Sequence, residues 1–228
     1  MLNGCLKRLQ ELVPRQCILC AAPVTHSWIC AACDIELPRL PVARCEVCAT
    51  PLSSGSACGA CLIHPPSFDR VSAAFAYEFP IDALICAFKY GRRLTLAPML
   101  GDALARIGAP RADVLVPMPL APRRQAERGF NQALELARCL SRRYRVPIAS
   151  TACRKIVDTL PQAALPWKER EKNVRRAFTC DPVFAGLRVA VVDDVLTTGA
   201  TLNELGRVLR RAGAITVSGY VLARTVPR

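Results

Sequence analysis

The sequence predicts an α/β protein in which a parallel β-sheet is flanked by helices and preceded by a small metal-binding module. From residue 65 onward, apolar strand-like runs alternate with helical segments, which is typical of a parallel sheet covered by helices. Four C-x-x-C pairs lie between residues 17 and 61, ahead of that alternation. Near residue 193 an apolar run leads into two adjacent acids, and ligands of such sheets bind at the carboxyl ends of the strands.

A chain of 228 residues is long enough for one sizeable α/β domain and one small module. We expect residues 1–16 to be a leader, either a short helix or a segment without fixed structure. We expect residues 17–64 to form the cysteine-rich module and residues 65–228 the larger domain. Charges and prolines interrupt every apolar stretch well short of a membrane span, and residues 1–16 lack the apolar core of a signal peptide. We therefore expect a cytoplasmic protein without a membrane span.

The cysteine-rich module consists of two halves with the same spacing, C-x₂-C-x₉-C-x₂-C. A reducing compartment favours metal binding over disulfides, and two C-x-x-C turns supply the four thiolates of a tetrahedral zinc site. This regular ribbon-like or knuckle-like spacing also favours zinc over an iron–sulfur cluster. We predict two structural zinc ions, with ligands Cys17, Cys20, Cys30, Cys33, Cys45, Cys48, Cys58 and Cys61. Pairing within each half is the simplest closure, and an interleaved arrangement of the four pairs stays open.

The net charge of +13 is unevenly distributed along the chain. Residues 106–176 contain sixteen Lys or Arg and six Asp or Glu, whereas residues 17–64 contain only two basic residues. The positive field of the larger domain suits a polyanionic partner such as a nucleotide or nucleic acid, although solubility alone also explains it. The cysteine-rich module has too few cations to follow a phosphate backbone, so we interpret it as a structural or docking module.

The segment from Val189 to Thr201 carries the main candidate binding site. Its apolar run reads as a buried strand that delivers Asp193 and Asp194 to its carboxyl end. Small residues and hydroxyls then form a bend in which backbone N–H groups can approach a phosphate, at the start of a helix. The bend residues are Thr197, Thr198, Gly199, Ala200 and Thr201. The acids would repel a phosphate, so they suit ribose hydroxyls or a bridging Mg²⁺ better.

The remaining strands and helices follow from local periodicity and from turn residues. We expect strands at 70–77, 113–116, 148–153, 188–192 and 216–222, and helices at 81–89, 94–107, 127–143 and 202–211. Gly213 occupies a position suited to the end of the last helix.

Two groups of cations are candidate catalytic residues. Arg123 and Arg124 follow the strand that ends near Pro117, and together they can hold a pyrophosphate bidentately. Arg154 and Lys155 begin a polar segment that runs to Asn173 and that we interpret as a lid over the site. Plain solvation of these charges is the alternative.

Residues 189–201 resemble the phosphoribosyl-pyrophosphate (PRPP) motif of type I phosphoribosyltransferases. Together with the segments 117–124, 128–132 and 154–178 and the cysteine pairs, they make the chain similar to the ComF/GntX family from Cys17 to near its end. Two departures are Ala21 and Ala49, which stand where a glycine often follows the cysteine pair.

The resemblance implies a type I phosphoribosyltransferase-like domain behind a double zinc module, in a family linked to natural competence and the use of external DNA. It implies that Asp193 and Asp194 hold the ribose hydroxyls of PRPP, that the bend 197–201 holds its 5′-phosphate, and that Mg²⁺ accompanies PRPP. An enzyme of this kind would transfer ribose 5-phosphate to an acceptor that the sequence does not identify. The alternative is a non-catalytic PRPP or nucleotide sensor that binds single-stranded DNA and docks competence proteins through its zinc module.

Overall fold

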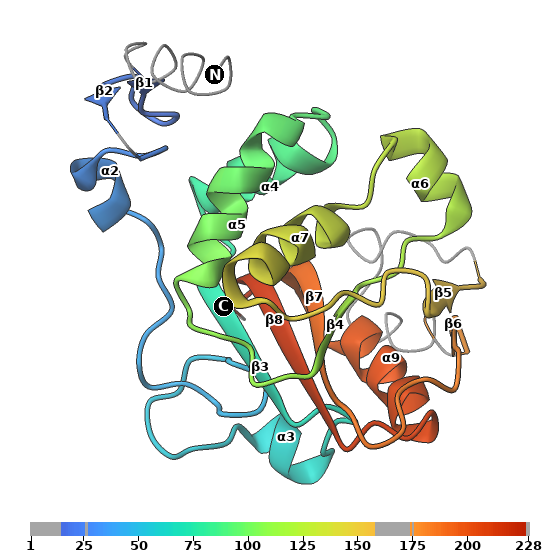
Figure 1. Cartoon of the computed structure of the whole chain (residues 1–228). Helices are drawn as coiled ribbons and strands as arrows, with labels where there is room; N and C mark the ends of the chain where they lie inside the picture. Colours follow the sequence, from blue (N-terminus) through green and yellow to red (C-terminus); the bar gives the residue numbers. More distant parts are fainter. Residues whose placement is uncertain (1–14, 26, 158–173, 175, 227–228) are drawn as a thin grey trace. The chain divides into compact units, whose positions relative to one another are not determined.

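The computed structural model describes residues 15–25, 27–157, 174 and 176–226 (Figure 1). Residues 1–14 of the expected leader and most of the expected lid segment lie outside these residues, whereas the last two residues of the expected leader form a strand. The chain divides into two compact units, Met1–Pro38 and Arg39–Arg228. The second half of the cysteine-rich module therefore belongs to the same compact unit as the main sheet. The predicted module boundary after residue 64 is not tested by this division, because the two compact units meet after Pro38.

The first unit contains a two-residue antiparallel pair and a short helix. β1 (Arg15–Gln16) pairs with β2 (Pro23–Val24), and α2 (Ala31–Ile35) follows. Cys30 caps α2, since its Sγ accepts a hydrogen bond from the backbone N–H of Cys33 at 3.5 Å. A helix that begins on a cysteine directs both sulfurs of the C-x-x-C pair to the same end of the helix.

The second unit is built on a four-stranded parallel sheet, as the sequence predicts. Its strands are β3 (Arg70–Ala76), β4 (Val114–Pro117), β7 (Arg188–Leu196) and β8 (Thr216–Arg224). They are arranged in the order β3-β8-β7-β4, so that β7 and β8 are the two central strands (Figure 1). A separate antiparallel pair is formed by β5 (Cys153–Lys155) and β6 (Phe178–Cys180).

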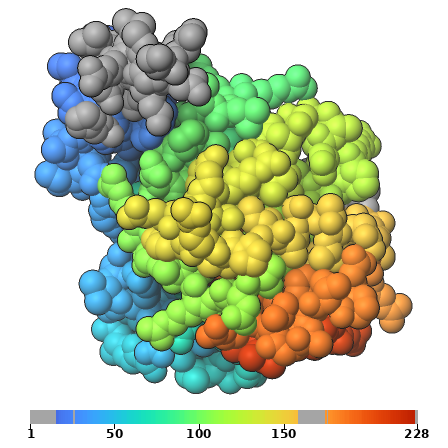
Figure 2. All heavy atoms as spheres, viewed as in Figure 1, coloured from blue at the N-terminus to red at the C-terminus, as the bar shows by residue number. Residues whose placement is uncertain are grey.

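Helices alternate with these strands and cover the sheet. They are α3 (Gly59–Ile63), α4 (Ile81–Lys89), α5 (Ala97–Ala105), α6 (Pro122–Arg128), α7 (Gln132–Tyr144) and α9 (Ala200–Arg211), with a 3₁₀ turn η1 at Leu94–Leu96. In the space-filling view, atoms of α7 and of the segment after it, in yellow, cover much of the face seen in Figure 1 (Figure 2). Within the described residues, no helix combines the length and apolarity that a bilayer crossing requires.

The core lies on both faces of the central strands, because successive side chains of a strand point to opposite faces. Val189 and Val191 of β7 pack with the buried leucines of α9 in one cluster. Ala190 and Val192 have the opposite parity and are fully buried on the face where α5 and α7 contact the sheet. Burial on both faces explains why the run before the acids is continuously apolar.

The structure corrects three sequence expectations. The helix expected at 127–143 is two helices, because Gly129 adopts φ 78° and ends α6, and the side chain of Asn131 then caps α7. The strand expected at 148–153 is reduced to one parallel bridge between Ile148 and Leu115, followed by β5. The strand expected to end at Val192 continues to Leu196, so both acids lie inside β7.

Candidate functional site

Asp193 and Asp194 lie in the last third of β7, on a central strand of the sheet. Their backbone is held in the ladder, since Asp193 pairs in register with Val221 and Leu196 pairs with Arg224. The side chain of Asp194 is buried and that of Asp193 is half-buried, and the two acids are close enough to interact with each other. The Oδ1 of Asp193 accepts a hydrogen bond from the N–H of Asp194 at 2.8 Å.

Lys89, the last residue of α4, is the charge partner of Asp194. Its Nζ lies 2.8 Å from Asp194 Oδ1, and the two side chains are 17% and 9% exposed. Burial alone would lower the pKa of Lys89, but the carboxylate of Asp194 outweighs that effect and leaves the pKa raised. Burial, together with the neighbouring charge of Asp194, raises the pKa of Asp193 from 3.8 to about 7. The two acids therefore differ: Asp194 is paired with Lys89, whereas the pKa of Asp193 is raised to about 7.

A cationic hollow of about 270 Å³ adjoins this ion pair. It is lined by Lys89, Tyr90, Arg92, Arg124, Glu127 and Arg128. Four cations against one acid make it suitable for a polyanion such as a pyrophosphate. Arg128 is fixed in place, because its guanidinium lies 5.1 Å from the centre of the Tyr90 ring and donates to Gln132 Oε1 at 3.0 Å.

Gln132 adds a potential donor beside the hollow. It is 2% exposed, and its Nε2 has no hydrogen-bond partner among the residues that the structure describes. Buried amide groups are normally paired, so an unpaired donor next to Arg128 is consistent with a site for an anionic ligand.

The predicted bend at 197–201 connects β7 to α9. Gly199 adopts φ 84° and occupies the N-cap of α9, where it provides no side-chain acceptor for the first-turn N–H groups. Thr198 Oγ1 accepts from the N–H of Ala200 at 3.1 Å, which shapes the turn. An anion at this end of a 12-residue helix can take the place of the missing cap.

The other predicted cations are distributed over the surface. Arg124 lines the cationic hollow, whereas Arg123 forms an exposed ion pair with Glu127 at 3.0 Å. Arg154 pairs with Asp181 at 2.7 Å, and Lys155 Nζ lies 5.8 Å from the centre of the Phe178 ring, at the antiparallel pair of β5 and β6. Catalytic roles for Arg123, Arg154 and Lys155 stay predictions.

The eight predicted metal ligands form two separate groups. Cys17, Cys20, Cys30 and Cys33 form one group, and Cys45, Cys48, Cys58 and Cys61 form the other, with all sulfurs of a group within 4.8 Å of one another. A tetrahedral zinc with Zn–S bonds of about 2.3 Å holds its sulfurs about 3.8 Å apart, so both groups fit zinc. The pairing is therefore within each half, and the interleaved alternative does not occur.

The two halves share their backbone hydrogen bonds as well as their spacing. In the first half, the N–H of Cys17 donates to Ala22 O and the N–H of Ala21 donates to Cys17 O. The same two hydrogen bonds occur 28 residues later, from Cys45 to Thr50 O and from Ala49 to Cys45 O. The two alanines that stand where a glycine often follows the cysteine pair have positive φ angles, 61° at Ala21 and 58° at Ala49. Each alanine therefore occupies the left-handed conformation that a glycine favours.

One thiol in each group ionises easily. Burial raises the pKa of Cys17 and of Cys48, but hydrogen bonds to their sulfurs outweigh it, and the pKa values fall to about 6 and about 7. Thr50 supplies the largest of these lowering effects at Cys48. A thiolate available near neutral pH is the form that binds zinc.

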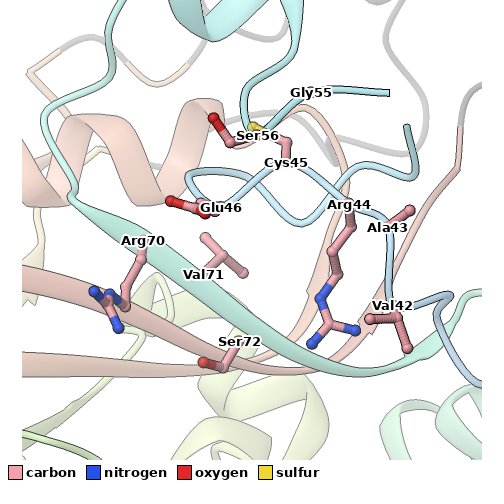
Figure 3. Close-up of a pocket in the computed structure, with 10 residues that line it drawn as sticks. All are labelled: Val42, Ala43, Arg44, Cys45, Glu46, Gly55, Ser56, Arg70, Val71 and Ser72. Carbon is pink, nitrogen blue, oxygen red and sulfur yellow. The ribbon is translucent and has the colours of Figure 1, made fainter. Parts of the chain in front are cut away.

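A second hollow, of about 610 Å³, lies away from the acids at the beginning of β3. It is lined by residues of the second cysteine half and of this edge strand, and Arg44 and Arg70 extend into it from opposite sides (Figure 3). Arg70 pairs in register with Ser218, whereas Asp193 pairs with Val221 further along β8. The hollow is therefore lined by the edge strand β3, whereas the acids lie on the central strand β7.

The binding roles of the acids and of the bend stay predictions, and the sequence analysis did not indicate Lys89 as the partner of Asp194. Lys89 ends an apolar helix and precedes Tyr90 and Gly91, where a Cβ would lie 2.6 Å from Ala87 O. The feature of the sequence that could have indicated Lys89 is a single lysine at the end of an apolar helix, just before a position where only glycine fits.

Comparisons with known proteins agree with the resemblance found in the sequence. Residues 8–62 match the double zinc ribbon domain family. The DNA utilization protein YhgH of Salmonella typhi is 33% identical over 224 residues, which cover 94% of this chain and 99% of that protein. Competence protein F of Haemophilus influenzae is 35% identical over 170 residues, covering 70% and 74%. Competence protein ComFC of Bacillus subtilis is 27% identical and covers 97% and 83%.

Solved structures overlap with part of the chain. Glutamine PRPP amidotransferase from B. subtilis aligns with a TM-score of 0.43 and 23% identity, covering 60% of this chain and 30% of that one. Purine phosphoribosyltransferase from Pyrococcus horikoshii aligns with a TM-score of 0.31 and 19% identity, covering 60% and 73%. The parallel sheet flanked by helices and the zinc module before it are confirmed.

Each four-cysteine group should hold one zinc ion. Protein purified without chelator should contain about two zinc ions per chain by elemental analysis, because four thiolates at tetrahedral spacing bind zinc tightly. Serine replacement of Cys20 or of Cys48 should each lower the content to about one. A content below one in the unmodified protein would contradict the structural-zinc assignment.

Removing Lys89 should destabilise the fold, because it leaves the charge of Asp194 buried without a partner. We expect Lys89→Met to lower the free energy of unfolding by about 3 kcal/mol or more, measured by urea denaturation. The control Arg138→Met breaks an exposed ion pair with Glu135 and should cost less than about 1 kcal/mol. Asp194→Asn added to Lys89→Met should recover stability, and equal losses for Lys89→Met and Arg138→Met would refute the buried pair.

Asp193 should give the fold a measurable pH dependence. Its pKa is about 7 in the folded protein, against 3.8 for an ordinary aspartate, so the folded state holds a proton that the unfolded state releases. As the pH rises from about 4 to about 7, the native protein should therefore lose stability relative to the Asp193→Asn variant. Urea denaturation at several pH values measures it, and a constant difference would show that the pKa is ordinary.

Proposed function

Because the chain belongs to the ComF/GntX family of competence and DNA-utilisation proteins, we propose that it binds Mg²⁺-PRPP and transfers ribose 5-phosphate to an acceptor. One observation carries the proposal: Lys89 both neutralises Asp194 and lines the cationic hollow. A ribose site and a pyrophosphate site would thereby be adjacent, as they must be because the pyrophosphate of PRPP is attached to ribose C1.

Each part of PRPP has a matching group of residues. The carboxylates of Asp193 and Asp194 suit the ribose 2′- and 3′-hydroxyls, as acceptors for two donors. The bend at 197–201 and the N-terminus of α9 suit the 5′-phosphate. Lys89, Arg92, Arg124 and Arg128 suit the pyrophosphate. Mg²⁺ enters with PRPP, and carboxylate oxygens near the ribose are ligands of the kind it prefers.

The proposed reaction breaks the bond between ribose C1 and the pyrophosphate oxygen and forms a bond from C1 to the acceptor. The bonding electrons leave with the pyrophosphate, so its growing negative charge must be stabilised. Guanidinium groups that are already in position do this without reorganisation, and holding both reactants in line lowers the entropic barrier. The chain's own residues therefore act by positioning and by charge neutralisation.

A second candidate function is supported by the net charge of +13. The same pocket would bind PRPP or a nucleotide as a signal, and the basic surface would bind single-stranded DNA. Exchange of labelled pyrophosphate into PRPP in the presence of candidate acceptors separates the two functions. Exchange supports transfer, whereas PRPP binding without exchange, together with salt-sensitive DNA binding, supports the sensor.

Variants at the two sites should lose binding differently. By calorimetry, Asp193→Asn with Asp194→Asn should abolish Mg²⁺-dependent PRPP binding. Arg124→Ala should weaken PRPP by at least about tenfold, about 1.4 kcal/mol, while ribose 5-phosphate affinity changes much less. Arg138→Ala removes an exposed guanidinium on α7 and serves as the control. Unchanged PRPP affinity in the double acid variant would exclude the acids from the site.

A further inference from the structure

Arg224 is a buried cation that has no carboxylate partner among the residues that the structure describes. It is the last residue of β8 and is 4% exposed, with its backbone paired to Leu196 on one side and Ala76 on the other. Every hydrogen-bond acceptor that the structure gives its guanidinium is a backbone carbonyl or a threonine hydroxyl. Burying a charge is costly unless an opposite charge or several hydrogen bonds compensate for it, so its position needs a reason.

The guanidinium connects the second cysteine half to the bend. On one side, Nε donates to Cys48 O at 3.0 Å and Nη2 donates to Thr50 Oγ1 at 2.9 Å. On the other side, Nη1 donates to Leu196 O at 3.2 Å and to Thr197 O. Because a guanidinium is planar and rigid, a displacement on one side is transmitted to the other.

Thr50 extends this connection to a metal ligand. Its hydroxyl accepts from Arg224, so its single proton is available to Cys48 Sγ, which lies 3.1 Å away. A zinc ion held by four thiolates carries a net charge of −2, which is the opposite charge that Arg224 otherwise lacks. Hydrogen bonds to metal ligands of this kind tune the affinity of a site for its metal.

The connection exists in one half only. Thr50 corresponds to Ala22 in the repeated backbone pattern, since Cys45 N–H bonds to Thr50 O as Cys17 N–H bonds to Ala22 O. An alanine has no hydroxyl to relay a hydrogen bond. The first half also belongs to a different compact unit from Arg224. The first cysteine group is therefore an internal control for the second.

On the other side, Arg224 holds the backbone where the phosphate-binding bend begins. In a trans peptide the carbonyl and the following N–H point in opposite directions. Fixing the carbonyls of Leu196 and Thr197 on Arg224 therefore fixes the N–H groups of Thr197 and Thr198 away from it. Those amides belong to the bend that can approach an anion.

We propose that Arg224 and Thr50 form a positioning relay, through which the metal-loaded state of the second cysteine group sets the geometry of the bend and its affinity for a sugar phosphate. The part that concerns the ligand rests on the proposed function. When the second site loses its metal, Arg224 loses an opposite charge and the turn that presents Cys48 O and Thr50 Oγ1. The carbonyl of Thr197 is then no longer held by Arg224, whereas the carbonyl of Leu196 keeps its hydrogen bonds from Thr225.

The test compares Thr50→Val, which removes the hydroxyl but keeps the shape, with Thr50→Ser, which keeps the hydroxyl. Thr25→Val, an exposed threonine of the first half, is the matched control. Hydrogen–deuterium exchange of peptides covering 197–203 reports on the bend without any ligand. Calorimetry with ribose 5-phosphate reports on affinity, and a colorimetric chelator follows zinc release.

With Thr50→Val we expect faster exchange in the bend, faster release of one zinc ion, and affinity for ribose 5-phosphate reduced about three- to tenfold. Thr50→Ser and Thr25→Val should behave like the native protein. Cys20→Ser, which damages the first site, should leave exchange in the bend unchanged, whereas Cys48→Ser should increase it. Unchanged exchange in the bend of Thr50→Val, or an equal increase in Cys20→Ser and Cys48→Ser, would overturn the relay.

These outcomes separate the relay from the proposed function. A native protein that binds neither PRPP nor ribose 5-phosphate would refute the proposed function, while the exchange measurements would still decide the relay. Arg224→Lys provides a second variant, because it keeps the charge but not the planar fork. It should increase exchange in the bend while the protein stays folded by circular dichroism, and native exchange rates in this variant would also overturn the relay.

Discussion

The ion pair between Lys89 and Asp194 is the interaction that organises the candidate site. It joins the end of α4 to the central strand β7 at a place where both partners are largely removed from water. In that environment an isolated carboxylate would be protonated or would displace its strand, so the pair makes two adjacent acids tolerable inside a sheet. Burial and then the charge of Asp194 raise the pKa of Asp193, while Lys89 opposes this rise. The pair also brings a cation to the hollow that three arginines line. One lysine therefore both compensates the charge of Asp194 and lines the cationic hollow.

The cysteine-rich module illustrates how a duplicated unit becomes asymmetric. Its two halves repeat the same turns and the same sulfur clusters, yet only the second shares a compact unit with the sheet. In that half, Ala49 is fully buried in the main core cluster and Arg39 forms a bridge with Phe75 of the edge strand. In the second half, the hydroxyl of Thr50 accepts a hydrogen bond from the buried Arg224, whereas the equivalent residue of the first half is Ala22, which has no hydroxyl. A metal centre that folds a small module can in this way also brace a neighbouring domain.

Particular segments show where sequence reasoning succeeded and where it did not. Periodicity located α4 at its observed bounds and placed β3 and β8 to within two residues, because these elements bury regular apolar faces. The helix expected at 127–143 failed because Gly129 and Asn131 act as end and start signals, whereas the apolar spacing continues across them. The acids were expected beyond the end of their strand but lie inside it, because pairing with β8 extends β7 to Leu196. Strand ends depend on the neighbouring strand, which a local pattern does not contain.

The sequence by itself determined the parallel sheet, the eight metal ligands, the acid pair and the bend, because each depends on spacing within a short stretch of chain. Only the tertiary structure decided that the cysteines group by halves, that Lys89 neutralises Asp194, that Arg124 rather than Arg123 lines the hollow, and that Arg224 links Thr50 to Leu196. These contacts join residues that are far apart along the chain. Their partners are selected by how strands and helices pack, and burial then determines which charges must meet.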